Sequence, residues 1–130
     1  MQFLLMIYAD ESAVESAGND EVARTLREYA AFTDALQRAG AYVGSNRLRE
    51  TGAAKTIRVR EGRSRVVDGP FTETKEQLGG YYLIDVPDLD IALSWAKRCP
   101  GTRYGAVEVG LRPLLATSTF ASRIASAKAQ

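Results

Sequence analysis

The stretch QFLLMIY at residues 2–8 is apolar or aromatic at every position after the first and has the length of one β-strand. Successive side chains of a strand point to opposite faces of its sheet, so this strand would be apolar on both faces. One face would carry Phe3, Leu5 and Ile7. The other would carry Leu4, Met6 and Tyr8. Residues 81–86 repeat most of this pattern, and we therefore expect both faces of the sheet to be covered.

Outward from this strand, residues 10–19 are polar or small and predict a loop or a loose turn. A helix follows, which Asn19 or Asp20 caps and Gly40 ends. The next elements are an extended segment over 41–48 and a hairpin over 56–67 with its turn near 61–62. The last three are a strand over 81–86 that begins at Gly79 and Gly80, a helix that Asp88 caps and Pro100 ends, and a strand over 106–111. The first helix would turn one apolar stripe to the sheet. That stripe is Val22, Leu26, Tyr29, Thr33 and Leu36.

Two helices side by side cover one face of a four-stranded sheet, which leaves the second face open. The simplest cover for the second face is another copy of the same sheet, and we favour this homodimer. The alternative is that the hairpin over 56–67 folds across that face. In either case the predicted fold class is α+β.

The amino-acid composition makes several classes of function unexpected for this chain. The 130 residues suit one domain, with 45% apolar residues, 25% charged residues and a net charge of +1. This balance gives no global attraction to nucleic acid or to an anionic membrane, so we expect neither as a partner. The chain has no His, the commonest general base and metal ligand, and one Cys, so no intrachain disulfide can form. We expect no metal and no cofactor.

The cellular setting is predicted from the first strand and the cysteine content. The apolar run at residues 3–9 is seven residues long, far below the ~20 that span a bilayer. No basic residue precedes this run, so a secretory signal is not expected. Together with the single Cys99, these features predict a reducing, cytoplasmic setting.

Residues 68–84, DGPFTETKEQLGGYYLI, strongly resemble the DGPF subgroup of the YCII-related proteins. Residues 3–10, 98–100 and 103–109 resemble the same family, and the likeness extends from residue 1 to about residue 112. It implies a ferredoxin-like βαββαβ fold with an inserted β-hairpin, which pairs into a dimeric α/β barrel. Because this chain has no His, the His-dependent chemistry proposed for many members does not transfer to it. Members are often encoded beside extracytoplasmic-function sigma factors, which makes a sigma factor a candidate partner.

The DGPF segment carries the candidate catalytic residues. Asp68 lies at a rigid turn with Gly69 and Pro70, where it would act as a general base. Glu73 or Tyr81 would be its proton partner. Substrate contacts would come from side chains that offer a ring or a cation, namely Tyr29, Arg47, Phe71 and Lys75. The alternative is that these residues have only structural roles: the carboxylate of Asp68 would stabilise its turn, the charged residues would lie in a solvated loop, and the aromatic residues would pack in the core.

Charge is uneven along the chain. Residues 47–65 hold seven basic and two acidic residues, a net of +5, and residues 66–90 hold one basic and six acidic residues, a net of −5. No aromatic residue interleaves the arginines, which favours a solvated hairpin face complementing an acidic partner over a nucleic-acid surface. Two functions stay open: a small homodimeric enzyme or binder that performs acid–base chemistry on a small polar or aromatic molecule, and a non-enzymatic domain that binds a protein such as a sigma factor.

Residues 113–130 lie beyond the resemblance and are rich in Ala, Ser and Thr. Apolar positions still recur there at helical spacing, which predicts a short helix. They are Thr117, Phe120, Ala121, Ile124 and Ala125. Because so short a helix is marginal alone, we expect it only where Phe120 and Ile124 dock on the rest of the chain or on a partner subunit.

Overall fold

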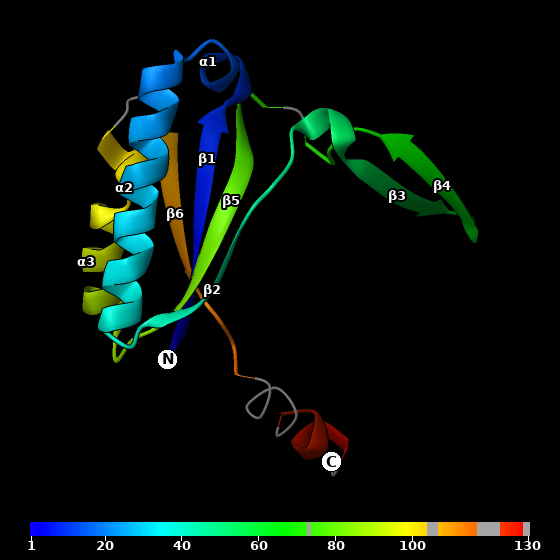
Figure 1. Ribbon diagram of the computed structural model, residues 1–130. Coiled ribbons are helices and arrows are strands. Elements are labelled where there is room, and N and C mark those ends of the chain that lie inside the picture. Colours follow the sequence, from blue (N-terminus) through cyan, green and yellow to red (C-terminus); the bar gives the residue numbers. More distant parts are fainter. Residues whose placement is uncertain (73, 104–106, 117–122, 129–130) are drawn as a thin grey trace.

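The computed structural model describes residues 1–72, 74–103, 107–116 and 123–128. Its elements, in chain order, are β1 (Gln2–Asp10), α1 (Glu11–Glu15), α2 (Asn19–Arg38), β2 (Tyr42–Arg47), the 3-10 turn η1 (Thr51–Ala53), β3 (Lys55–Arg60), β4 (Arg63–Asp68), β5 (Glu76–Asp85), α3 (Leu89–Arg98), the 3-10 turn η2 (Pro100–Arg103) and β6 (Val107–Pro113) (Figure 1). Residues 123–128 are also helical.

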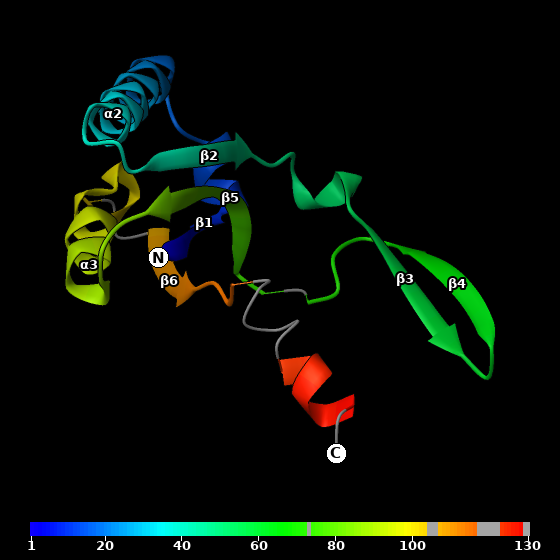
Figure 2. The same cartoon turned by 90° about the horizontal axis from the view of Figure 1, so that it is seen from below.

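Four strands form one antiparallel sheet in the order β2-β5-β1-β6, and β3 pairs with β4 in a separate hairpin. The helices α2 and α3 lie on one face of the sheet, and the hairpin extends away from it (Figures 1 and 2). The predicted α+β fold, a four-stranded antiparallel sheet with an added hairpin, is confirmed. We call the sheet with α2 and α3 the body, and the β3–β4 hairpin the arm.

The core of the body lies between the sheet and the two helices. Phe3 of β1 and Ile84 of β5 are fully buried and pair with each other across the two strands. Phe32 of α2 packs edge-on against Tyr82 at a ring-centroid distance of 5.2 Å and against Trp95 of α3 at 6.1 Å. One apolar face of β1 is thus covered as its alternation predicts.

Several local signals in the sequence act as expected. Gly40 has a φ of 69° and follows the end of α2, where its N–H donates to the Gln37 carbonyl at 3.1 Å. Asp88 caps α3 by accepting a hydrogen bond from the Ile91 N–H at 2.9 Å. The arm turns at residues 61–62, both of which have positive φ, as a two-residue hairpin turn requires.

Two predictions near the start of α2 are wrong. The segment after β1 contains the helix α1 instead of only a loop or a loose turn, because the Asp10 carboxylate accepts from the Ser12 N–H at 3.0 Å and starts a helical turn. The residue at the N-cap of α2 is Gly18, which makes no side-chain cap, so Asn19 and Asp20 fall inside the helix.

The boundaries of β5 also differ from the prediction. The strand begins at Glu76, so Gly79 and Gly80 lie inside it instead of opening it. A Cβ at Gly80 would lie 3.0 Å from the Asn46 carbonyl oxygen, so glycine allows β2 and β5 to approach. At the other edge, β6 continues to Pro113, which pairs with Phe3.

The second face of the sheet, which we call the open face, is apolar and only partly shielded. Its half-buried side chains on the two central strands are Leu4, Met6, Tyr8, Tyr81 and Leu83. Figure 2 shows no helix or strand of the described residues over this face. The alternative that the hairpin folds across it is wrong for this structure, because the arm projects outward and its Ile57 is 69% exposed.

The predicted C-terminal helix falls partly outside the described residues, since Phe120 is not among them. Residues 123–128 are helical and lie apart from the body in both views (Figures 1 and 2). Ile124 is exposed, so the expected docking of this residue on its own chain is not seen.

Candidate functional site

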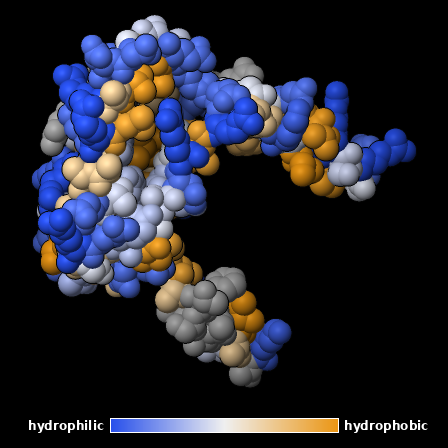
Figure 3. All heavy atoms as spheres, in the orientation of Figure 1, coloured by the Kyte–Doolittle hydropathy of each residue, from blue (hydrophilic) through white to orange (hydrophobic). Residues whose placement is uncertain are grey.

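The N-terminal half of α2 stands away from the sheet. The predicted stripe of this helix is buried at Leu36 and half-buried at Tyr29, yet Leu26 on the same stripe is 54% exposed and Val22 is also exposed. Figure 3 shows apolar side chains in a hollow beside α2 at this level. We call the space between this half of α2 and the sheet the cleft. It is an apolar surface that the described residues of the chain leave unfilled.

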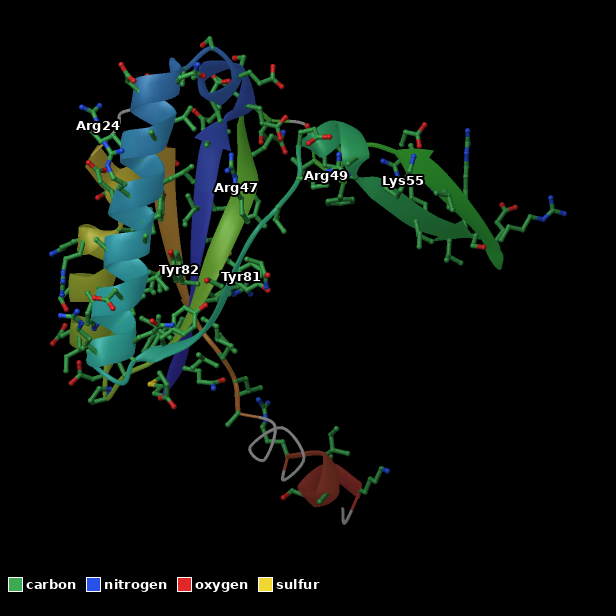
Figure 4. All side chains as sticks on the ribbon, in the orientation of Figure 1. Arg24, Arg47, Arg49, Lys55, Tyr81 and Tyr82 are labelled. Carbon is green, nitrogen blue, oxygen red and sulfur yellow. The ribbon has the colours of Figure 1, made fainter. Side chains whose placement is uncertain are left out.

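Arg47 lies at the mouth of the cleft. It pairs with Gly80, which pairs with Ile7, and residues directly opposite in antiparallel strands share a face, so Arg47 is on the helix side of the sheet. Figure 4 shows its side chain beside β1 and β5, where Figure 3 has the hollow. The guanidinium is exposed, and among the described residues no carboxylate lies within 4 Å of it.

Hydroxyl groups lie on the same face further along the sheet. The Tyr82 and Thr33 hydroxyls are 2.7 Å apart, and those of Tyr42 and Ser45 are 2.8 Å apart. Burial raises the pKa of Tyr82, so this phenol stays protonated near neutral pH and keeps its O–H to donate. Sequence reasoning missed Tyr42, Ser45 and the role of Leu26.

Tyr29 and Cys99 meet behind these hydroxyls. The Cys99 sulfur lies 3.9 Å from the Tyr29 hydroxyl, and the cysteine is fully buried. Burial raises the pKa of both groups above their ordinary values. Neither is therefore ionised near neutral pH, and the thiol is a packing group instead of a nucleophile.

Asp68, predicted as a general base, lies at the end of β4 at the root of the arm and is exposed. The Lys55 ammonium donates a hydrogen bond to its carboxylate, and this bond together with the charge of Lys55 lowers the pKa of Asp68. A carboxylate with a lowered pKa is a weaker base near neutral pH. In the turn after it, the Gly69 N–H donates a hydrogen bond to the Ala54 carbonyl at 2.8 Å. Gly69 has a φ of 96°, a backbone conformation that favours glycine.

The remaining predicted site residues lie on different surfaces. Tyr81 is on the open face, where its hydroxyl accepts from the Asn46 amide at 2.7 Å. Phe71 is 81% exposed, and Lys75 is exposed near Asp10. Glu73 lies outside the described residues. The structure thus brings Tyr29 and Arg47 to one side of the sheet and separates them from Tyr81.

In the part of the chain that the structure describes, no group of three or more His, Cys, Asp or Glu side chains gathers to hold a metal ion. None of the described helices combines the length and the apolar character that crossing a membrane requires.

Comparison with known proteins finds one family. Residues 1–112 match the family model of the YCII-related domain, which gives no subgroup. Over 114 residues the chain is 38% identical to an uncharacterized protein of Rhizobium meliloti (strain 1021), an alignment that covers 88% of this chain and 92% of that protein. Residues 113–130 extend past the match to the family model.

Proposed function

The chain belongs to the family of YCII-related domain proteins, and we propose that it is a homodimeric binding protein whose cleft takes one small anionic molecule with an apolar or aromatic body. The observation that carries this proposal is an exposed arginine without an acidic partner among the described residues, set beside an unfilled apolar surface. Small-molecule sites typically combine an apolar lining with a few polar groups that fix orientation.

Different residues of the cleft would contact the apolar and the anionic parts of the ligand. Leu26 and Ile7 would contact the apolar body of the ligand, and the Arg47 guanidinium would hold a carboxylate or phosphate through two parallel hydrogen bonds. The Tyr82 hydroxyl, on the same side of the sheet, donates a hydrogen bond to the Thr33 hydroxyl, which in turn donates to the Tyr29 carbonyl, so this pair fixes the packing of α2 on the sheet beside the cleft. None of these contacts requires proton transfer.

Acid–base catalysis has less support than binding. The proposed base Asp68 has a lowered pKa and pairs with Lys55, and the proposed proton partner Tyr81 lies on the other side of the sheet from Arg47. The conclusion is therefore a binder of small molecules, with no metal or nucleotide cofactor. The DGPF subgroup, read from residues 68–84, remains part of the proposal.

The open face supports the homodimer. Five partly exposed apolar or aromatic side chains lie together there on β1 and β5, and a second sheet of the same shape would cover them. Such pairing of two ferredoxin-like sheets forms a dimeric α/β barrel, and a stable interface of this kind buries ~1,600 Å² or more. The cytoplasm remains the proposed location.

The ligand proposal is tested by calorimetric titration with a panel of aromatic carboxylates, each beside its neutral amide. Arg47→Gln should weaken carboxylate binding about tenfold or more, because a hydrogen bond to a charged group contributes about 1.5–3 kcal/mol. Arg49→Gln is the matched control, since Arg49 is exposed nearby and lies 3.6 Å from the Glu50 carboxylate. Equal losses in both variants, or no preference for acid over amide, would contradict the proposal.

The dimer is tested by sedimentation equilibrium at micromolar concentration. The wild-type chain should sediment at twice its own mass, and Met6→Glu should weaken association at least a hundredfold, because a charge would be buried between the sheets. Leu115→Glu, at an exposed position beyond β6, should leave the dimer intact. A wild-type monomer at this concentration would show that the open face does not pair.

A further inference from the structure

The two faces of the arm differ in chemistry. Residues directly opposite in β3 and β4 share a face, and two such pairs consist only of arginine, Arg58 with Arg65 and Arg60 with Arg63. These four exposed arginines define what we call the basic face. The opposite face carries Ile57, Val59 and Val66, each more than 60% exposed.

The basic face has no neutralising group in the described structure. No carboxylate of the described residues lies within 4 Å of any of its four guanidinium groups. The acidic side chains of the arm lie elsewhere, Glu61 in the turn and Asp68 on the opposite face beside Lys55. The basic face is therefore an uncompensated local charge on a chain whose total charge is only +1.

This charge opposes the folding of the arm. Like charges directly opposite each other destabilise an antiparallel pair, and an isolated two-stranded hairpin is marginally stable in water. The arm contains two such pairs, and all four of its arginines are exposed. An anionic partner would relieve the repulsion in both pairs at once.

We propose that the arm docks an extended acidic segment of a partner protein, which adds to the hairpin as a third strand. The arm is a two-stranded sheet in the described structure, so both its outer edges are free to accept a strand through backbone hydrogen bonds. Side chains on one face of a strand recur every second residue, about 6.6 Å apart. A segment with carboxylates at alternate positions places one beside each arginine pair, where the guanidinium fork binds a carboxylate in bidentate fashion.

The arm favours a protein over a nucleic acid. A two-stranded ribbon fits the major groove of DNA, but base reading there uses Asn or Gln beside Arg, and single strands are bound by stacking on aromatic rings. Residues 55–68 contain no Asn, no Gln and no aromatic residue. The opposite face instead suits the apolar side chains that alternate with the carboxylates of an amphipathic strand.

The test is a calorimetric titration of the full chain with a synthetic peptide that alternates glutamate with valine. Three probes accompany it: a peptide of the same composition with its glutamates grouped, the alternating peptide with N-methylated backbone amides, and a single-stranded oligonucleotide of equal charge. The alternating peptide should bind at least tenfold more tightly than each of the other three. Its affinity should also fall at least tenfold at high salt, because exposed charges are screened.

A paired set of variants locates the binding. Arg60→Thr with Arg63→Thr removes one arginine pair but keeps strand-forming residues, and should weaken the alternating peptide at least tenfold. Arg24→Gln with Arg27→Gln makes the same charge change on α2, where Arg24 points away from the sheet, and should change affinity less than twofold.

Three results would overturn the proposal. If the oligonucleotide binds more tightly than the alternating peptide, the arm is a nucleic-acid surface. If N-methylation of the peptide backbone leaves its affinity for the wild-type chain unchanged, the peptide does not add to the hairpin as a strand. A change in the sedimenting mass of the Arg60→Thr, Arg63→Thr chain would mean that the basic face covers a second copy of this protein.

Discussion

The body and the arm are both antiparallel β-structure, yet they place their apolar residues in opposite surroundings. In the body, Phe3 and Ile84 pair although they are far apart in the sequence, and both are fully buried under two helices. In the arm, Ile57 and Val66 pair across a tight turn and stay exposed. The body is therefore explained by its own core, whereas the arm has no such core among the described residues, and we propose that a partner protein accounts for its composition.

The largest expected effect that separates the two regions is on the free energy of unfolding. Leu36→Ala removes a fully buried side chain from the core and should lower the free energy of unfolding by about 2–5 kcal/mol. Val59→Ala, on the exposed face of the arm, should lower it by less than about 0.5 kcal/mol. Urea denaturation at one fixed protein concentration gives both values.

The concentration dependence sharpens this comparison. If Val59→Ala proves as costly as Leu36→Ala, and its cost shrinks when the protein is diluted, the arm is held by a second copy and not by solvent. A cost that is large at every concentration would contradict the distinction between body and arm.

Two glycines give a second, smaller contrast. Gly80→Ala in the body would bring a Cβ to 3.0 Å from the Asn46 carbonyl, so β2 must shift, at a cost of about 1–3 kcal/mol. Gly62→Ala in the arm meets open space but is strained by a φ of 74°, at a cost of about 1 kcal/mol. Amide exchange should become faster across the sheet in Gly80→Ala and only in the arm in Gly62→Ala. The reverse pattern would contradict the contrast between body and arm.

The sequence predicts those parts of the fold that depend on local chemistry. The alternation in residues 2–8, the left-handed Gly40 and the cap at Asp88 each act within a few residues, and each is confirmed. The same rules fail at α1 and β5. There Asp10 caps a helical turn within a polar segment, and β5 begins at Glu76, before the two glycines that resemble a strand boundary, of which Gly80 allows the close approach of β2.

The candidate site is less accessible to sequence reasoning because it depends on what tertiary packing leaves empty. Helical spacing assigns Leu26 to the buried stripe, and only the packing of α2 reveals that this position is exposed. The location of Arg47 follows from the register of β2 against Gly80, which no local motif specifies. Asp68 is the converse case, since its motif is conspicuous while its surroundings are those of a solvated turn.

The smallest expected effect concerns the ion pair at the root of the arm. Lys55 lowers the pKa of Asp68, so the pair stabilises the arm above the ordinary carboxyl pKa of about 3.9, and this stabilisation is lost as the pH falls through the lowered pKa. In Lys55→Met the pKa of Asp68, followed by carboxyl NMR, should rise toward the ordinary value. The acid-dependent amide exchange of the arm should disappear, while unfolding of the body stays unchanged.

Asp68→Asn completes this test, because it keeps the size and turn preference of the residue and removes its charge. If Asp68 belongs to the arm, this variant removes the same acid dependence and leaves carboxylate binding in the cleft unaltered. If cleft binding or any turnover falls while the unfolding free energy holds, Asp68 acts in the site. The separation between body and arm would then fail at the residue where the two regions join.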